Sequence, residues 1–551
     1  MNHDGKPSKS STFVWATVVL TATAWHAAAP AQTVSAPLVR EATEAKTSST
    51  QDTHLLMAAA PMRVWREGEP VRVKDDLKAE AVAAPAARPT VKRVDLLLGR
   101  ATNAAPKAVT LSPNVPTNFD GIGATGVLPP DPIGAVGPNH YIQMVNSAFA
   151  IYDKTGTRLA GPSQINSLWK QFGGPCENQN DGDPVVRYDH LADRWLVSQF
   201  AVDDHMQCIA ISRGPDPVSS GWFLYAFPTK DASGNAVTPD YPKIGVWPDG
   251  YYMSTQRGFP SEGLDVWVFE RDKMLAGQPA RQVQFAIAAP SIVLQPSDLT
   301  GPAPPAGTPN YFVRPVDGQR FSGNDRLEVF EFAVDWSAPA NSTFKLAASI
   351  PTAAFDSVLC TNDLLGACVP QPNTAVRLET LTAWPMFRAQ YRNFGTRQTL
   401  LLNHSVDATG SDIAGVRWYE LRKTVSTPWK IFQQGTHSPD NVHRWMGSIA
   451  MDQAGNIALG YSVANSTTFP GLRVATRTRT TAKGKMGPEI VIVNGGGSQT
   501  NSAARWGDYG SMDVDPARPC TFWYTSLYYA QTSSAGWRTR VAEIRMPSCM
   551  P

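Results

Sequence analysis

The sequence carries little charge and no extended run of either sign. Only 17% of its 551 residues are Asp, Glu, Lys or Arg, and 49 basic against 47 acidic residues leave a formal net charge of +2. No nucleic-acid partner is expected, because proteins hold polyanions mainly through clustered Lys and Arg. The hydrophobic share of 42% supplies enough apolar material for a large core, which excludes wholesale disorder.

Long hydrophobic runs are also missing. No stretch reaches the roughly 18 uninterrupted apolar residues that a membrane helix needs, so no membrane span is expected. Near the N-terminus, Lys6 and Lys9 precede a shorter apolar stretch from Thr12 to Trp25, and small residues follow up to Ala31. This order predicts a signal peptide over residues 1–31 and a soluble product that is exported to the periplasm or the extracellular space.

Cysteine is scarce, and its spacing excludes some chemistry. The chain has six cysteines and no Cys-x-x-Cys motif, so a metal site built on thiolates is not expected. An even count in an oxidising compartment predicts disulfide bonds. Other pairings of six cysteines are formally open, but proximity and position in the repeat described below favour the pairs Cys176 with Cys208, Cys360 with Cys368, and Cys520 with Cys549.

The composition changes along the chain after the signal peptide. Residues 32–117 are rich in Ala, Pro and Thr, which is typical of a linker or pro-segment. From 118 to 551, short aromatic and β-branched runs alternate with Gly, Pro, Asn and Asp, and a helical period of 3.6 residues is almost absent. This pattern predicts an all-β body.

The body contains an internal repeat. The segment from Asp240 to Ser254 resembles the one that starts at Asp508, and the segment from Arg444 to Asp452 resembles that from Arg505 to Asp513. Earlier copies begin at residues 131 and 183. We interpret each copy as an apolar strand, a turn and an aromatic strand.

A second motif follows most copies, and we interpret it as the outer strand of a four-stranded unit. Its copies are Phe149–Asp153, Trp222–Phe227, Val266–Glu270, Leu327–Phe332, Val416–Glu420, Leu472–Thr476 and Trp537–Val541. They lie about 65 residues apart on average. This spacing predicts a single β-propeller of six or seven four-stranded blades. A tandem of β-sandwiches is the alternative, although its repeats would be nearer 100 residues.

Polar residues stand at or just before the predicted inner strands of the blades. Inner strands gather around one channel, so these side chains are expected to ring its mouth, where Arg matches carboxylates and Asp accepts from hydroxyls. The candidate ligand-binding residues at these positions are Asp131, Asp183, Asp240, Arg444, Arg505 and Asp508. The alternative is that they hydrogen-bond strand ends and neighbouring blades.

One segment combines residue types that suit acid, base or nucleophile roles. Arg388 and Tyr391 lie close together, His404 follows on the next strand, and Glu379 lies upstream. A single His in a strand can equally be structural. Familiar catalytic motifs are missing, since the sequence has no Gly-x-Ser-x-Gly, no His-Glu-x-x-His and no phosphate loop.

No cofactor is firmly indicated. The segment from Glu177 to Asp183 is rich in oxygen ligands, so Asp181 and Asp183 are candidate ligands for calcium. Its glycine is misplaced for a helix-loop-helix calcium site.

The body contains several long motifs, among them Gly137–Tyr141, Phe387–Gly395, His443–Asp452 and Arg505–Tyr509. These motifs resemble those of a family of large secreted bacterial proteins, largely uncharacterised, that is loosely grouped with sialidase-like propellers. The resemblance covers nearly the whole body and implies the propeller fold and export, but no reaction. The chain departs from the family pattern at Ser526–Tyr528, where an acidic residue is expected before the tyrosine.

Two functions remain open from the sequence. The first is a secreted propeller that binds an extracellular glycan or protein at the mouth of its channel. The second is a sialidase-like glycan hydrolase, in which Arg388, Arg444 and Arg505 would hold a substrate carboxylate. Tyr391 would then be the nucleophile that attacks the sugar at the scissile bond, with Glu379 as its base. The first is favoured, because the sequence yields no complete catalytic set.

Overall fold

The computed structural model describes residues 1, 32–47, 62–74, 92–98, 113–257, 262–289, 291–360, 366–382 and 384–547. The chain divides into two units, residues 1–31 and 32–551. The predicted signal peptide, apart from Met1, lies outside the described residues, as does Cys549 of the third predicted disulfide. The following description concerns the unit from residue 32 onward.

Among the described residues, consecutive strands pair antiparallel and in chain order within six sets of four strands and a last set of three. The first set consists of β6 (Ile133–Val136), β7 (His140–Val145), β8 (Ala148–Asp153) and β9 (Arg158–Gln164). The second consists of β10 (Gly182–Asp189), β11 (Arg194–Ala201), β12 (Met206–Ser212) and β13 (Trp222–Pro228). The third consists of β14 (Asp240–Trp247), β15 (Gly250–Gln256), β16 (Leu264–Phe269) and β17 (Arg281–Ile287). The all-β prediction is confirmed.

The later sets follow the same order. They are β18 (Gln295–Thr300), β19 (Asn310–Val316), β20 (Arg326–Ala333) and β21 (Thr343–Pro351); β22 (Pro385–Asn393), β23 (Gln398–Asp407), β24 (Ala414–Thr424) and β25 (Thr427–His437); β26 (His443–Met451), β27 (Ile457–Asn465), β28 (Thr468–Arg477) and β29 (Glu489–Val493); and β30 (Ser511–Val514), β31 (Thr521–Tyr528) and β32 (Arg538–Arg545). Five short helices connect strands of the described residues: η1 (Ile165–Trp169), α2 (Pro175–Asn178), α3 (Arg271–Leu275), α4 (Gly318–Phe321) and η2 (Pro339–Asn341).

The first strands of the sets close into a ring. In chain order, β6, β10, β14, β18, β22, β26 and β30 each contact the next, and β30 contacts β6. At one point the contact is a direct parallel pairing of β18 with β22, from Ser297 opposite Ala389 to Thr300 opposite Arg392. A ring of antiparallel sheets with their first strands innermost is the architecture of a β-propeller. We call these first strands the inner strands.

The last set is completed by a strand from the other end of the body. β4 (Asn118–Gly123) pairs antiparallel with β32, with Phe119 opposite Val541. This pairing closes the ring with backbone hydrogen bonds and leaves β32 without an open edge.

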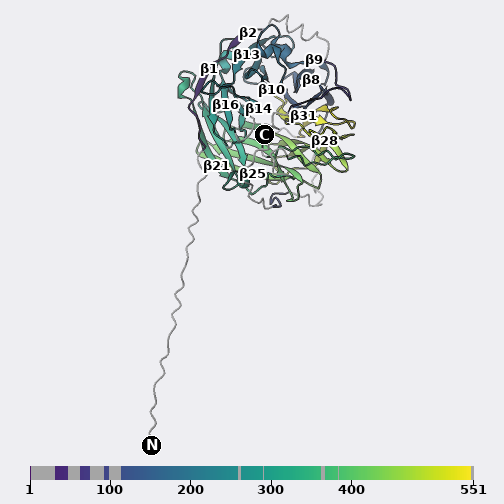
Figure 1. The fold of residues 1–551 in the computed structure, drawn as a ribbon. Helices are drawn as coiled ribbons and strands as arrows, with labels where there is room; N and C mark the ends of the chain where they lie inside the picture. The colour runs from purple at the N-terminus through teal and green to yellow at the C-terminus, as the bar shows by residue number, and fades with distance from the viewer. Residues whose placement is uncertain are drawn as a thin grey trace. The chain divides into compact units, whose positions relative to one another are not determined.

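The segment predicted as a linker, residues 32–117, contributes further strands. β1 (Leu38–Glu41) adds to the edge of β17 and β2 (Glu44–Thr47) adds to the edge of β13. β3 (Arg72–Val73) runs parallel to β5 (Val127–Leu128). Figure 1 shows β1 and β2 in purple beside strands from much later in the chain. Asp95 also forms a fully buried ion pair with Arg417 of β24, at 2.7 Å.

The predicted outer strands are mostly third strands. Leu327–Phe332 lies in β20 and Val416–Glu420 in β24, and each has a further strand beyond it. Burial contributes to this, since the third strand β16 is buried at every position, whereas the fourth strand β21 is exposed or partly buried at every position except Phe344. A fourth strand of this kind lacks the apolar signature on which the prediction depended. The motif at Trp222–Phe227 does fall on a fourth strand, β13.

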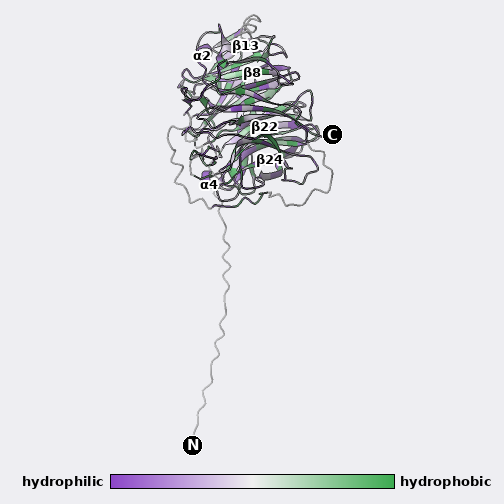
Figure 2. Ribbon diagram, turned by 90° about the vertical axis from the view of Figure 1, so that its right-hand side faces the viewer, coloured by the Kyte–Doolittle hydropathy of each residue, from purple (hydrophilic) through white to green (hydrophobic). Residues whose placement is uncertain are grey.

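The core consists of apolar side chains between adjacent sheets, and hydrophobic segments run along the strands (Figure 2). Sheets that pack on both faces explain why many strands are continuously apolar instead of alternating. Two of the predicted disulfides are confirmed, Cys176 with Cys208 and Cys360 with Cys368. No helix among the described residues is long and apolar enough to cross a membrane.

Candidate functional site

Four of the predicted acidic residues meet where the inner strands begin, which we call the start side of the ring. They are Asp131, Asp183, Asp240 and Asp508, all buried. Burial and the nearby carboxylates of Asp183 and Asp508 raise the pKa of Asp131 well above its ordinary value. Asp131, Asp183 and Asp508 also have positive φ angles of 48°, 44° and 62°. Such left-handed backbone is costly for these residues and persists only where the surroundings hold it.

Cations lie among these carboxylates. Lys74, from the segment next to β3, donates to Asp183 Oδ1 at 2.7 Å. Lys243 Nζ lies over the rings of Tyr241 and Tyr509, 3.1 and 3.4 Å from their centroids. Burial lowers the pKa of Lys243 well below its ordinary value, although Asp183 and the neighbouring carboxylates oppose this shift. The start side is thus a buried network of opposite charges.

Arg505 joins Glu379 to this network. Arg505 donates to Glu379 Oε2 at 3.1 Å and to Asp508 Oδ2 at 2.7 Å, and the backbone N–H of Trp506 donates to Glu379 Oε1 at 2.7 Å. Burial raises the pKa of Glu379 to about 8, against the lowering effect of Arg505. Glu379 and Arg505 are 1% and 3% exposed, so both are removed from solvent.

The other two predicted arginines lie in separate ion-pair networks. Arg444 bonds to Asp440 and Glu489, with Arg444 Nε 2.9 Å from Glu489 Oε1. Arg388 bonds to Asp298 and Asp513, at 2.7 and 2.5 Å. Each of the three arginines Arg388, Arg444 and Arg505 has carboxylate partners of its own. In this arrangement their charges are already neutralised within the protein.

The predicted catalytic side chains are not joined by any hydrogen bond or ion pair within the described part of the chain. The ring of Tyr391 packs against Trp247, with 4.7 Å between centroids, and burial raises the Tyr391 pKa. His404 Nε2 lies 3.1 Å from Tyr419 Oη. Burial, together with Arg417, lowers the pKa of His404 to about 3, so its imidazole is neutral over the physiological range.

A cavity of about 100 Å³ lies where the inner strands finish, which we call the end side of the ring. Inner strands of several sets contribute to its wall, among them Val136 of β6, Arg187 of β10, Thr300 of β18, Arg392 of β22 and Asp513 of β30. His190 and Asp515, which follow β10 and β30, line it as well. A concave site assembled from several blades, with charged side chains in a partly apolar wall, is the kind of place where a ligand binds.

Two arginines and two aspartates form a closed group beside this cavity. Arg187 bonds to Asp298 and Asp513, at 2.5 and 3.4 Å, and Arg388 bonds to the same two carboxylates. Burial alone would raise the pKa of Asp513, but the two arginines outweigh this effect and lower the pKa below its ordinary value. Asp513 is therefore ionised at neutral pH, and the charges of the group balance.

Most other polar groups in the cavity wall also have partners. His190 Nε2 donates to the carbonyl of Gly301 at 2.7 Å. Asp515 accepts from Lys154 Nζ at 2.7 Å, and Thr300 Oγ1 accepts from Arg388. These bonds fix the shape of the wall and leave few of its groups free for a ligand.

Arg392 is different. It is 5% exposed, its Nη1 has no hydrogen-bond partner, and among the described residues it forms no ion pair. Its guanidinium carbon lies 5.7 Å from the ring centroid of Phe394. Burial lowers its pKa to about 10, an effect that the neighbouring Arg388 increases and Asp452 opposes. An unpaired guanidinium in a cavity wall can donate to a ligand.

The predicted calcium ligands are occupied by donors. Asp181 accepts from Arg72 Nη2 at 3.2 Å and from the backbone N–H of Val202 at 2.9 Å, and Asp183 holds Lys74. Neither belongs to the group of described residues whose ligand atoms converge within 4.8 Å. Calcium at these aspartates remains a prediction.

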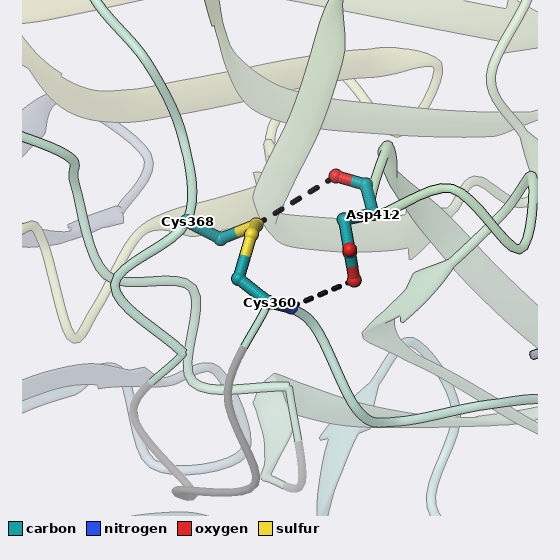
Figure 3. Close-up of side chains that lie close together, drawn as sticks. All are labelled: Cys360, Cys368 and Asp412. Carbon is teal, nitrogen blue, oxygen red and sulfur yellow. Dashed lines mark hydrogen bonds between the residues drawn. A yellow bond between two sulfur atoms is a disulfide. The ribbon is translucent and has the colours of Figure 1, made fainter. Parts of the chain in front are cut away.

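The converging group consists of Cys360, Cys368 and Asp412 (Figure 3). Its sulfur atoms are bonded to each other, and the backbone N–H of Cys360 donates to Asp412 Oδ1 at 2.7 Å. Disulfide sulfur is not a thiolate ligand, so this group ties a loop and does not hold a metal in its oxidised form.

Comparisons with known proteins give only distant likenesses. No protein-family model matches the chain, and no curated protein matches it. Similar solved structures include the endo-arabinase from Bacteroides thetaiotaomicron VPI-5482, at 13% identity over 55% of this chain and 95% of that chain, with a TM-score of 0.27. An ulvan lyase of polysaccharide lyase family PL25 is 13% identical over 77% of this chain and 95% of that chain, with a TM-score of 0.34.

A third similar structure is the Trypanosoma rangeli sialidase in complex with 2,3-difluorosialic acid, at 11% identity over 58% of this chain and 56% of that chain, with a TM-score of 0.30. At such TM-scores no residue role is carried from these proteins to this chain.

The sequence predicts the acidic residues of the start side but not the residues that line the end-side cavity. Arg392 lies one residue beyond Tyr391 in the segment predicted to hold catalytic residues, and Asp513 closes the repeat that begins at Arg505. The available signal was position, since both residues lie near the finishing ends of inner strands.

Proposed function

We propose that this protein is an exported β-propeller that binds an extracellular glycan at the end-side cavity. The observation that carries the proposal is the cavity itself, a recess of about 100 Å³ with charged and hydroxyl side chains from several inner strands in its wall. Such a recess suits a saccharide, which presents both hydroxyl groups and apolar ring faces. The proposal includes a ring of seven blades, one for each inner strand.

Export is part of the same proposal. The N-terminal sequence has the order of a signal peptide, and two disulfides suit an oxidising compartment. In that compartment glycans and other proteins are the available large ligands.

Most of the tryptophans lie in the core and cannot stack on a sugar. Eleven are among the largest fully buried side chains, including Trp247, Trp418 and Trp523. Recognition of a glycan would therefore depend on hydrogen bonds and charge at the cavity, together with its apolar contacts, which are Val136, Leu299, Val514, Pro516 and Pro519.

A screen of the purified chain from residue 32 onward on a glycan array tests the proposal. Thr300→Val removes a hydroxyl from the cavity wall, and Thr467→Val, on an exposed turn after β27, is its matched control. We expect binding that Thr300→Val weakens and Thr467→Val does not. Absence of binding to any glycan, with binding to an extracellular protein instead, would overturn the glycan assignment.

Glycan cleavage is the second candidate, and the observation behind it is a pair of start-side carboxyl groups with different pKa shifts, although Glu379 is buried. The pKa of Glu379 is raised to about 8 by burial, whereas Lys74 and neighbouring donors outweigh burial and lower that of Asp183. Carboxyl groups whose pKa values are pushed apart suit acid and base roles. Product analysis of each bound glycan distinguishes the candidates, since a shortened glycan means cleavage and an intact one means binding alone.

A further inference from the structure

The cavity wall holds one charge that the protein does not neutralise. Of the charged side chains that line it in the described structure, Arg187 and Asp513 are paired with each other and with their neighbours, and Asp515 is paired with Lys154. Arg392 alone has no ion pair there. Burying a charge without a partner costs free energy, because the charge loses its hydration and gains no compensating interaction.

Asp452 is the carboxylate that affects the pKa of Arg392, and it has hydrogen-bond partners of its own. Asp452 raises the Arg392 pKa electrostatically, but it does not form an ion pair with it. Asp452 accepts from the side chain of Asn456 at 2.8 Å and from the backbone N–H groups of Ala454 and Asn456. It closes the turn after β26 and is not available as a counter-ion.

The strand and its neighbour hold the guanidinium at the cavity. Arg392 lies opposite Thr300 in the parallel pairing of β22 with β18, so its backbone is fixed between two strands. Gly301 follows Thr300, and a Cβ atom at Gly301 would lie 3.1 Å from Arg392 Cζ. The missing side chain at residue 301 leaves the room that the guanidinium occupies.

A second guanidinium, that of Arg388, makes the surroundings of Arg392 more positive. Arg388 lies near enough to lower the Arg392 pKa further, but its own partners, Asp298 and Asp513, are shared with Arg187. An anion in the cavity would meet a donor with no competing partner. Guanidinium groups match carboxylate and sulfate groups through paired, charge-assisted hydrogen bonds.

We propose that Arg392 binds the anionic substituent, a carboxylate or a sulfate group, of a saccharide that enters the end-side cavity. This inference rests on the proposed glycan-binding function and specifies its ligand as an acidic glycan. Both anions present two oxygens to a guanidinium, and the experiment below separates them.

The test compares three oligosaccharides of equal length, one with uronate groups, one with sulfate groups and one neutral. Their binding to the chain from residue 32 onward is measured by calorimetry for the wild type, Arg392→Gln, Arg392→Lys and Arg397→Gln. Arg397 is the control, because it belongs to the hairpin between β22 and β23 but does not line the cavity. Inorganic sulfate is titrated separately into all four proteins.

We expect at least one acidic oligosaccharide to bind the wild type about tenfold or more tightly than the neutral one, since charge-assisted hydrogen bonds are the stronger ones. Arg392→Gln should remove that preference, Arg392→Lys should keep part of it, and Arg397→Gln should keep all of it. The preferred oligosaccharide identifies the anion as carboxylate or sulfate.

The outcomes separate the two proposals. Equal binding of neutral and acidic oligosaccharides, unchanged in Arg392→Gln, would overturn the anion assignment and leave glycan binding in place. Sulfate binding that depends on Arg392, without binding of any oligosaccharide, would support the anion site and overturn the glycan function. If nothing binds to the folded wild type, both are wrong.

Discussion

Charged side chains are paired differently at the two ends of the inner strands. At the start side, Lys74 and Arg505 bond directly to carboxylates, and Lys243, whose Nζ has no hydrogen-bond partner, lies over the rings of Tyr241 and Tyr509 with carboxylates nearby. At the end side, Arg187 and Arg388 are matched by aspartates, but Arg392 is not. A buried network of opposite charges contributes to the fold, whereas a charge without an ion pair in a cavity wall is poised for a ligand.

The backbone differs in the same way. Inner strands begin irregularly, with register shifts between Gly182 and Val185 in β10 and between Asp240 and Lys243 in β14. Such bulges turn side chains out of the regular alternation of a strand. At the end side β18 and β22 are in continuous register up to Thr300 and Arg392. The start side thus uses local strain to gather its charges, and the end side presents Arg392 from regular strands.

The largest effect should come from breaking the start-side network. Arg505→Ala leaves Glu379 and Asp508 without their common partner in a buried environment, and loss of one member of a buried pair costs about 3–5 kcal/mol of unfolding free energy. Urea unfolding measures the loss. Arg505→Lys keeps the positive charge but not the guanidinium that bonds to both carboxylates, so it should lose less unfolding free energy than Arg505→Ala. If Arg505→Ala unfolds like the wild type, the start side is not the stabilising network described above.

A smaller loss is expected for Lys74→Met. The change keeps most of the side-chain volume but removes the donor to Asp183, and a hydrogen bond to a charged group contributes about 1.5–3 kcal/mol. Thermal unfolding of Lys74→Met beside Arg63→Met, an exposed residue of the same segment, measures the difference. Equal melting temperatures would show that residues 62–74 cover the start side without stabilising it.

Position in a repeat could be predicted from the sequence, but pairing between distant residues could not. Asp131, Asp183 and Asp508 recur at the same place in successive copies, so their meeting at one side of a ring follows from the fold class. The unpaired state of Arg392 depends instead on the partners of the nearby carboxylates, since Asp452 accepts from Asn456 and Asp298 pairs with Arg388. No local pattern carries that information.

The inner strand β18 shows a second limit. Its sequence from Gln295 to Thr300 is polar and contains Pro296, so it has the pattern of a loop. Pairing with β19 on one side and β22 on the other buries almost all of it and makes it a strand. Tertiary contacts override local propensity here.

The pH dependence of stability distinguishes the sides further. Burial raises the folded-state pKa of Glu379 to about 8, above its ordinary value, so the folded state binds this proton more tightly than the unfolded state does. The stabilisation is fully present below the ordinary Glu pKa and is lost as the pH rises to about 8, with a slope of up to about 1.4 kcal/mol per pH unit. Urea unfolding from pH 4.5 to 8 follows this slope.

Glu379→Gln is the matched control for that measurement, because it replaces the carboxyl by a neutral amide of the same size. The difference in unfolding free energy between the wild type and Glu379→Gln should change with pH in this window, while an end-side variant such as Thr300→Val should run parallel to the wild type. A constant difference between wild type and Glu379→Gln would mean that Glu379 is ionised in the folded protein.

The smallest effect is expected at the end side, and its sign is informative. Arg392→Gln removes a buried charge without breaking an ion pair, so the unfolding free energy should stay within about 1 kcal/mol of the wild type or rise. Adding sulfate should raise the melting temperature of the wild type and of Arg397→Gln more than that of Arg392→Gln, because a ligand stabilises only the state that binds it. A large loss of stability in Arg392→Gln would mean that Arg392 has a structural partner. The contrast between the closed start side and the open end side would then disappear.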